Sequence, residues 1–183
     1  MDRRAEKVAE LRKAIAAMER APSGKLESSE RCEKGEDAFS RIVQLSSFRD
    51  RTCSEIRTRL SEEGFEADEI EIAIDRATSC GLVDDMRFAD SRIRSLVRKG
   101  KGEKCIVFDL KGFGIDVCDV PGWPSAYLEL GRKGEYDRAL ALLVRKPSRS
   151  KDPFRGAYQK LVRNGYSTEV SFRAAKHWAG EQE

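Results

Sequence analysis

Apolar residues recur at three- and four-residue steps along most of the chain, from about Glu36 onward. This spacing places them on one face of an α-helix, and no run of alternating apolar and polar residues predicts a strand. The stretch 105–108 has a strand-like composition, but Ile106 and Leu110 keep helical spacing. The pattern predicts an all-α protein.

A skeleton of the form apolar-x3-Leu-x3-Gly-apolar occurs three times in the chain. Its first two positions lie one helical turn apart. The glycine falls just past the helix end, where a positive φ is needed, and the last residue can pack back onto the leucine. The skeleton therefore predicts a helix and its C-terminal end in each copy. The copies are Ile56, Leu60, Gly64 and Phe65; Ile106, Leu110, Gly114 and Ile115; and Ala157, Leu161, Gly165 and Tyr166.

Helical stretches flank each copy of the skeleton, which predicts three tandem three-helix repeats at residues 36–83, 84–131 and 132–183. Such repeats form an elongated, curved array. Residues 1–35 are interpreted as an N-terminal extension, with a helix at 2–20 followed by a polar linker. The third helix of the second repeat is a departure, because Pro121 and Pro124 argue against a continuous helix from Asp119. A helix that starts late, with Pro124 in its first turn, fits better.

The sequence of the joint between the first two repeats predicts the end of one helix and the start of the next. Gly81 fits the residue that ends a helix, Asp84 fits the cap of the next one, and Asp85 adds negative charge there. Phe88 opens the apolar face of that next helix. Adjacent carboxylates at a helix start point in different directions, so capping is preferred over a metal or catalytic pair.

No arrangement of residues predicts catalysis or a cofactor. The five cysteines are scattered and read as small buried residues, and His177 is the only histidine. The P-loop pattern is absent, so we predict no nucleotide site. We also see no membrane span and no secretory signal, which makes the cytoplasm the default expectation. For the oligomeric state, an elongated monomer is the default expectation.

Charge is distributed unevenly although the net charge is only +3. Residues 36–83 carry 6 Lys/Arg against 11 Asp/Glu, whereas residues 132–183 carry 12 against 6. An acidic first repeat and a basic last repeat bear on the choice of partner rather than on the fold.

The ordered motifs resemble the RecX family of RecA regulators. They run Leu82-Val83-Asp84-Asp85-x-Arg87-Phe88-Ala89, then Lys99-Gly100-x-Gly102, then the skeleton endings, over residues 36–179. The resemblance implies tandem three-helix repeats and binding to the RecA recombinase, especially its filament on single-stranded DNA. It also implies inhibition of the ATPase and strand exchange of RecA, with contact to DNA as a further implication. The altered third helix of the second repeat leaves open any partner contact made there.

Two basic stretches are candidates for contact with RecA or DNA, each against the alternative of an ordinary solvated loop. The first is a glycine-containing turn before a helix, where lysines and backbone N–H groups can hold phosphate. The second is the densest basic region and would confer salt-sensitive affinity for a nucleoprotein. Arg87 is a weaker candidate that can instead pair within the fold. The candidates are Arg87; Lys99, Lys101 and Lys104; and Arg145, Lys146, Arg149, Lys151, Arg155, Lys160 and Arg163.

Two functional hypotheses follow from these features. The first is a RecX-like regulator that inhibits the RecA filament without catalysis, by bridging or blocking subunits. The alternative is a sequence-nonspecific or helix-turn-helix DNA-binding protein, since tandem helices with Arg and Lys can dock on DNA. The acidic first repeat argues mildly against this alternative.

Overall fold

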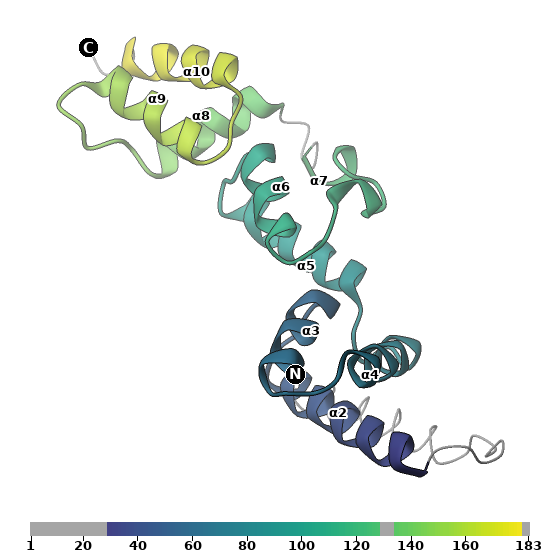
Figure 1. Ribbon diagram of the computed structural model, residues 1–183. Helices are drawn as coiled ribbons and strands as arrows, with labels where there is room; N and C mark the ends of the chain where they lie inside the picture. Colours follow the sequence, from purple (N-terminus) through teal and green to yellow (C-terminus); the bar gives the residue numbers. More distant parts are fainter. Residues whose placement is uncertain (1–28, 129–133, 181–183) are drawn as a thin grey trace, which may run out of the picture. The chain divides into compact units, whose positions relative to one another are not determined.

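The computed structural model describes residues 29–128 and 134–180, with side chains from Asp37 onward (Figure 1). All regular elements within these residues are helices, as the apolar spacing predicts. The chain divides into two compact units, one ending at Phe88 and one beginning at Ala89. The predicted helix at 2–20 lies outside the described residues.

The first unit holds the first repeat. Its helices are α2 (Ser29–Phe48), α3 (Cys53–Glu62) and α4 (Ala67–Ser79), and α5 (Asp85–Arg98) begins at its end. The start of α2 lies inside the predicted linker, so the last part of that segment is helical. Residues 30–34 explain this difference, because Glu, Arg and Lys are good helix formers and the helix continues directly into the first core positions.

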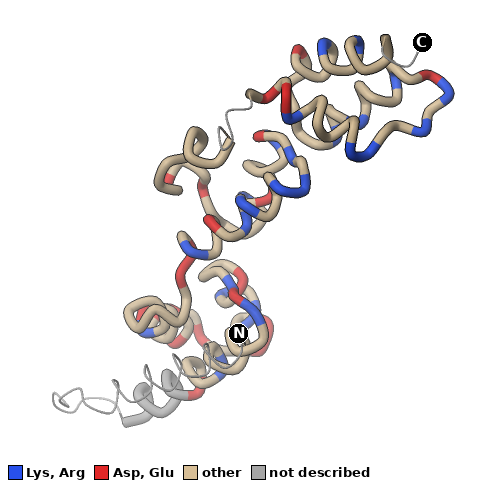
Figure 2. Tube along the Cα trace, turned by 180° about the vertical axis from the view of Figure 1, so that it is seen from behind, with Lys and Arg blue, Asp and Glu red and all other residues tan. Residues whose placement is uncertain are grey.

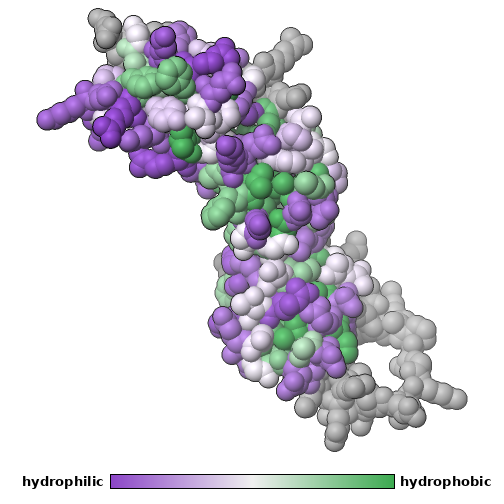
Figure 3. Space-filling view, turned by 45° about the horizontal axis from the view of Figure 1, so that its top comes forward, coloured by the Kyte–Doolittle hydropathy of each residue, from purple (hydrophilic) through white to green (hydrophobic). Residues whose placement is uncertain are grey.

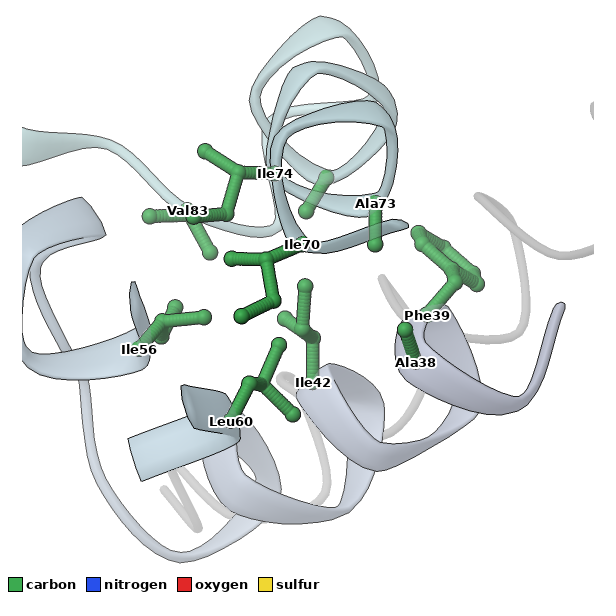
Figure 4. Close-up of a cluster of buried hydrophobic side chains, with 10 residues drawn as sticks. Ala38, Phe39, Ile42, Ile56, Leu60, Ile70, Ala73, Ile74 and Val83 are labelled. Carbon is green, nitrogen blue, oxygen red and sulfur yellow. The ribbon is translucent and has the colours of Figure 1, made fainter. Parts of the chain in front are cut away.

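The core of the first unit is formed by the apolar faces of these helices. Ile42 from α2, Leu60 from α3 and Ile70 from α4 point toward one another, with Ile56 and Val83 beside them (Figure 4). Ile42, Ile56 and Leu60 have no exposed surface. Each fully buried aliphatic side chain contributes about 1.5–3 kcal/mol, so this small core holds the repeat together.

The second unit holds the second and third repeats. After α5 come α6 (Glu103–Lys111), the 3-10 helix η1 (Val117–Asp119), α7 (Ser125–Leu128), α8 (Glu135–Arg145), α9 (Pro153–Arg163) and α10 (Thr168–Gly180). The third repeat has its own core, in which Leu142, Leu161 and Trp178 are buried. The second repeat buries Ile93, Ile106 and Leu110.

The prolines of the second repeat interrupt its third helix, as expected. Up to Leu128, where the described part of this segment ends, the structure has η1 and the single-turn helix α7, and α7 begins directly after Pro124. Leu128 donates its backbone N–H to the carbonyl of Pro124, so the proline caps this turn. Tyr127, 4% exposed, fills the core position that a longer helix would supply.

All three skeleton copies end their helices as the sequence predicts. Gly64, Gly114 and Gly165 have φ values of 89°, 76° and 87°. The residue after each glycine donates its backbone N–H to the carbonyl of the skeleton leucine. The N···O distance is 3.2 Å from Phe65 to Leu60. This is the hydrogen bond of a Schellman ending, and it confirms the three predicted helix ends.

Hydrogen bonds at the joint between the first two repeats confirm the predicted caps. Leu82, the residue after Gly81, donates its N–H to the carbonyl of Ala77 at 2.9 Å. The carboxylate of Asp84 accepts from the N–H of Arg87 at 2.8 Å. Asp85 has a further role that its position did not predict, because its carboxylate accepts the N–H of Cys53 at the start of α3.

Candidate nucleic-acid interface

The first basic turn precedes α6, and its backbone is already engaged. Gly102 donates its N–H to the carbonyl of Asn164 at 2.7 Å, and Lys104 donates to Gly165 at 3.2 Å. The positive N-terminal end of α6 thus meets the carbonyls at the end of α9, a favourable arrangement of helix dipoles. These N–H groups therefore do not support the phosphate contact considered for them. The lysine side chains of the turn stay candidates for contact with phosphate.

Two glycines make this junction sterically possible. A Cβ built on Gly102 would lie 2.5 Å from the carbonyl oxygen of Gly165, and one built on Gly165 would lie 2.3 Å from the nitrogen of Cys105. Gly165 also has positive φ, so it has two reasons to be glycine. Sequence reasoning identified only the second reason, because the first depends on a contact between repeats.

Two side chains of the third repeat also hold the end of α5. Arg145 donates to the carbonyl of Arg98 at 3.0 Å, and the Tyr166 hydroxyl donates to the carbonyl of Gly100 at 3.1 Å. A cation at the C-terminal end of a helix is stabilising. These contacts bring the first basic turn next to the second basic region, although Arg98 and Arg145 lie 47 residues apart in sequence.

Lys160 has a structural role within the second basic region. Its Nζ donates to the carbonyls of Lys146 and Pro147, at 3.2 Å for Pro147, and so ties α9 to the loop after α8. Burial, together with the nearby charges of Lys146 and Arg163, lowers the pKa of Lys160. The cationic side chains of this region therefore lie close enough to repel one another.

Most of the other candidates present their side chains to solvent. Blue positions follow the turn before α6 and the loop between α8 and α9 (Figure 2). Lys101 is half-buried. We call the exposed set in the second unit the basic surface, and it consists of Lys99, Lys104, Arg145, Lys146, Arg149, Lys151, Arg155 and Arg163.

Arg87 lies in the first unit and is not part of the basic surface. Its side chain is exposed, and its guanidinium donates to the carbonyl of Gly81 at 3.4 Å. It therefore contacts the end of α4 within the fold. Phe88, at the start of the same helix, is half-buried.

Among residues 29–128 and 134–180, no group of three or more His, Cys, Asp or Glu side chains could hold a metal ion. No helix in that part of the chain is both long and apolar enough to cross a bilayer. His177, the single histidine, contacts the Tyr136 hydroxyl through Nδ1 at 2.9 Å.

Comparisons with known proteins agree with this architecture. The model of the RecX first three-helix domain matches residues 38–76. The regulatory protein RecX of Mycolicibacterium vanbaalenii is 32% identical over 158 residues, which cover 80% of this chain and 84% of that protein. The RecX of Mycobacterium ulcerans is 30% identical and covers 74% of this chain and 81% of its own.

Solved structures share the fold. A crystal structure of regulatory protein RecX aligns with a TM-score of 0.61 at 21% identity, and covers 91% of this chain and 87% of that one. RecX from Lactobacillus salivarius aligns with a TM-score of 0.63 at 18% identity, and covers 80% of this chain and 97% of its own. The two relatives of 32% and 30% identity, which align along most of the chain, confirm the resemblance seen in the motifs, and the chain belongs to the RecX family of regulatory proteins.

Proposed function

We propose that this protein binds the RecA filament on single-stranded DNA and inhibits its ATPase and recombinase activity without catalysis. The observation that carries the proposal is membership of the RecX family along most of the chain, in a protein whose second unit bears the basic surface. A filament on DNA offers both protein and phosphate contacts. Lysines and arginines displayed on helices and loops suit such a target.

The mechanism is bridging or blocking of filament subunits. Each three-helix repeat has its own core, so each can offer a separate contact. Several weak contacts on one chain raise the overall affinity for a polymer far above the affinity for one subunit. The backbone junction at Gly102 fixes the second and third repeats together, so the basic surface acts as one site.

The test is the ATPase rate of preformed RecA filaments on single-stranded DNA, with this protein titrated in well below the RecA concentration. A fall in rate at substoichiometric amounts is the expected result. A variant with Lys99→Glu and Lys146→Glu on the basic surface should need about ten-fold more protein for the same inhibition. Lys176→Glu, at an exposed position of α10, is the matched control. An unchanged ATPase rate at excess protein would overturn the proposal.

Direct DNA binding is the second candidate function, and the basic surface favours it. The same variants separate the two functions when binding to poly-dT is measured without RecA. Tight binding of the protein to bare DNA, with no effect on filament ATPase, would favour the second candidate. Equal affinity for monomeric RecA and for filament would count against bridging.

A further inference from the structure

Phe108 is exposed in a way that the repeat does not require. Its side chain lies on α6 and is 81% exposed. The equivalent positions of the skeleton, two residues after its first apolar residue, hold Thr58 in the first repeat and Gln159 in the third. Both are polar, as expected for the outer face of a helix. The repeat folds without an aromatic residue there, so Phe108 has another reason to be present.

Phe108 lines an open groove of about 470 Å³ between the second and third repeats. Val107 lies beside it, half-buried, and forms the apolar part of the groove with it. The opposite side comes from the third repeat, through Glu135, Gly165 and Ser167. In Figure 3, green hydrophobic groups lie among purple hydrophilic ones on the face in view.

The groove is built from parts that are held in place. Its two sides are joined at the backbone by the bond from Lys104 to Gly165. Glu135 is fixed by two hydrogen bonds from Ser167, one from the N–H at 2.7 Å and one from the hydroxyl at 2.9 Å. A preformed groove loses little conformational entropy when it binds a partner.

The charges at the groove indicate what binds there. Lys104 and Lys111 lie one helical turn before and after the apolar pair on α6. Glu103 and Glu135 also line the groove, but the carboxylate of Glu135 is engaged by Ser167. Two lysines around an apolar centre suit a large apolar side chain flanked by carboxylates. A lining of mixed sign suits a peptide, which can place carboxylates against the lysines and neutral groups against the glutamates, rather than a nucleic acid, which is negatively charged at every nucleotide.

We propose that this groove docks a peptide segment of a protein partner, with an apolar side chain against Phe108 and acidic residues against Lys104 and Lys111. The inference rests on the proposed function, under which the partner is RecA. It assigns the protein contact to the groove, Lys104 included, whereas the other members of the basic surface supply the contact with phosphate. Apolar anchors in preformed pockets commonly dominate the affinity of an interface.

The experiment compares Phe108→Gln, which installs the residue of the third repeat, with Phe48→Gln as control. Phe48 ends α2 and is 83% exposed, so the control removes the same side chain from a comparably exposed position. Binding to RecA filaments on poly-dT and to bare poly-dT is measured by fluorescence anisotropy. Phe108→Gln should weaken filament binding at least about ten-fold and leave binding to bare DNA unchanged. Lys111→Glu, which lies on the groove but outside the basic surface, should weaken filament binding as well.

Each other outcome overturns the inference. If wild-type protein binds and inhibits the filament and Phe108→Gln does so equally well, the groove proposal fails and the proposed function stands. If Phe108→Gln weakens binding to bare DNA as much as to filament, Phe108 stacks on bases and the peptide partner is wrong. If wild-type protein does not bind the filament, the proposed function fails and the groove proposal fails with it.

Discussion

The backbone N–H of Gly102 donates to the carbonyl of Asn164 at 2.7 Å, and this bond joins the start of α6 to the end of α9. A helix start normally leaves N–H groups without a partner, and a helix end leaves carbonyls. Here each end satisfies the other across two repeats. The same contact positions both the basic surface and the groove beside Phe108, so the junction organises the second unit.

Substituting Gly165 with Ala should destabilise the second unit by more than the positive φ of Gly165 alone would cause. Gly64→Ala is the matched control, because Gly64 has almost the same φ, 89° against 87°, but no atom within 4 Å of a built Cβ. We expect Gly64→Ala to lower the free energy of unfolding by about 1 kcal/mol, because alanine is strained at positive φ. We expect a further 1–3 kcal/mol or so for the clash with Cys105 in Gly165→Ala.

The measurement is urea unfolding of both variants. Far-UV circular dichroism follows the whole chain. Tryptophan fluorescence follows the second unit, because Trp123 and Trp178 both lie there. Equal losses in the two variants would mean that the junction relaxes around a methyl group and contributes no close packing.

Local signals in the sequence predicted the helix ends and caps correctly. The spacing of Leu60, Gly64 and Phe65 contains the whole Schellman ending, because its hydrogen bonds join residues five apart. Thr52 and Glu55 form the capping box that their spacing indicates. Such features depend on neighbouring residues, so one sequence is enough to identify them.

Contacts between repeats could not be predicted in this way. Nothing local to Gly102 indicates that it lies against Gly165. The position of Asp85 indicates only negative charge at the start of its own helix, but its carboxylate also accepts the backbone N–H of Cys53. Phe108 was missed because its neighbours Ile106 and Leu110 carry the helical pattern. Comparison of the three skeleton copies would have found it, since the other two copies are polar at that position.

Binding to single-stranded DNA without RecA should weaken with salt through the basic surface. Binding to single strands weakens with salt, and each lysine that contacts a phosphate steepens the fall of the log of the binding constant against log salt by about 0.7. Changing Lys99 and Lys146 to Glu should therefore lower the slope by about 1.4 and weaken binding at all salt concentrations. Anisotropy with labelled poly-dT at a series of NaCl concentrations measures both quantities. The Lys176→Glu control changes the net charge by half as much and should keep the wild-type slope, whereas a fall of about 0.7 there would mean that only net charge matters.

The capping box at α3 should contribute measurably to the stability of the first repeat. The buried Thr52 hydroxyl accepts from the N–H of Glu55 at 3.2 Å. Thr52→Val keeps the shape of the side chain but removes the acceptor, and should cost about 1 kcal/mol of unfolding free energy. Thr58→Val is the matched control on the same helix, because the Thr58 hydroxyl is exposed and donates to the carbonyl of Ser54 at 3.0 Å. We expect a change within about 0.5 kcal/mol there, measured by urea unfolding with circular dichroism.

Ion pairs in the first unit should make its stability fall in acid. The hydrogen bond from Arg41 lowers the pKa of Glu63, and the bond from Arg57 lowers the pKa of Glu71. A carboxylate whose pKa is lower in the folded state stabilises the fold above its unfolded pKa of about 4.3, and that contribution is lost as the pH falls through the folded value. The melting temperature should therefore hold from pH 7 to about 5 and fall below about 4.

Removing the two arginines tests whether these pairs cause the acid response. The variant with Arg41→Gln and Arg57→Gln should show a shallower fall in melting temperature between pH 5 and about 3, because the two glutamates then titrate nearer their unfolded values. Added salt should reduce the difference from wild type, since both pairs face solvent. Lys176→Gln also removes a positive charge, and it should leave the acid response as in wild type. If the double variant keeps the wild-type response, other carboxylates govern acid stability and the Arg41 and Arg57 pairs contribute little to it.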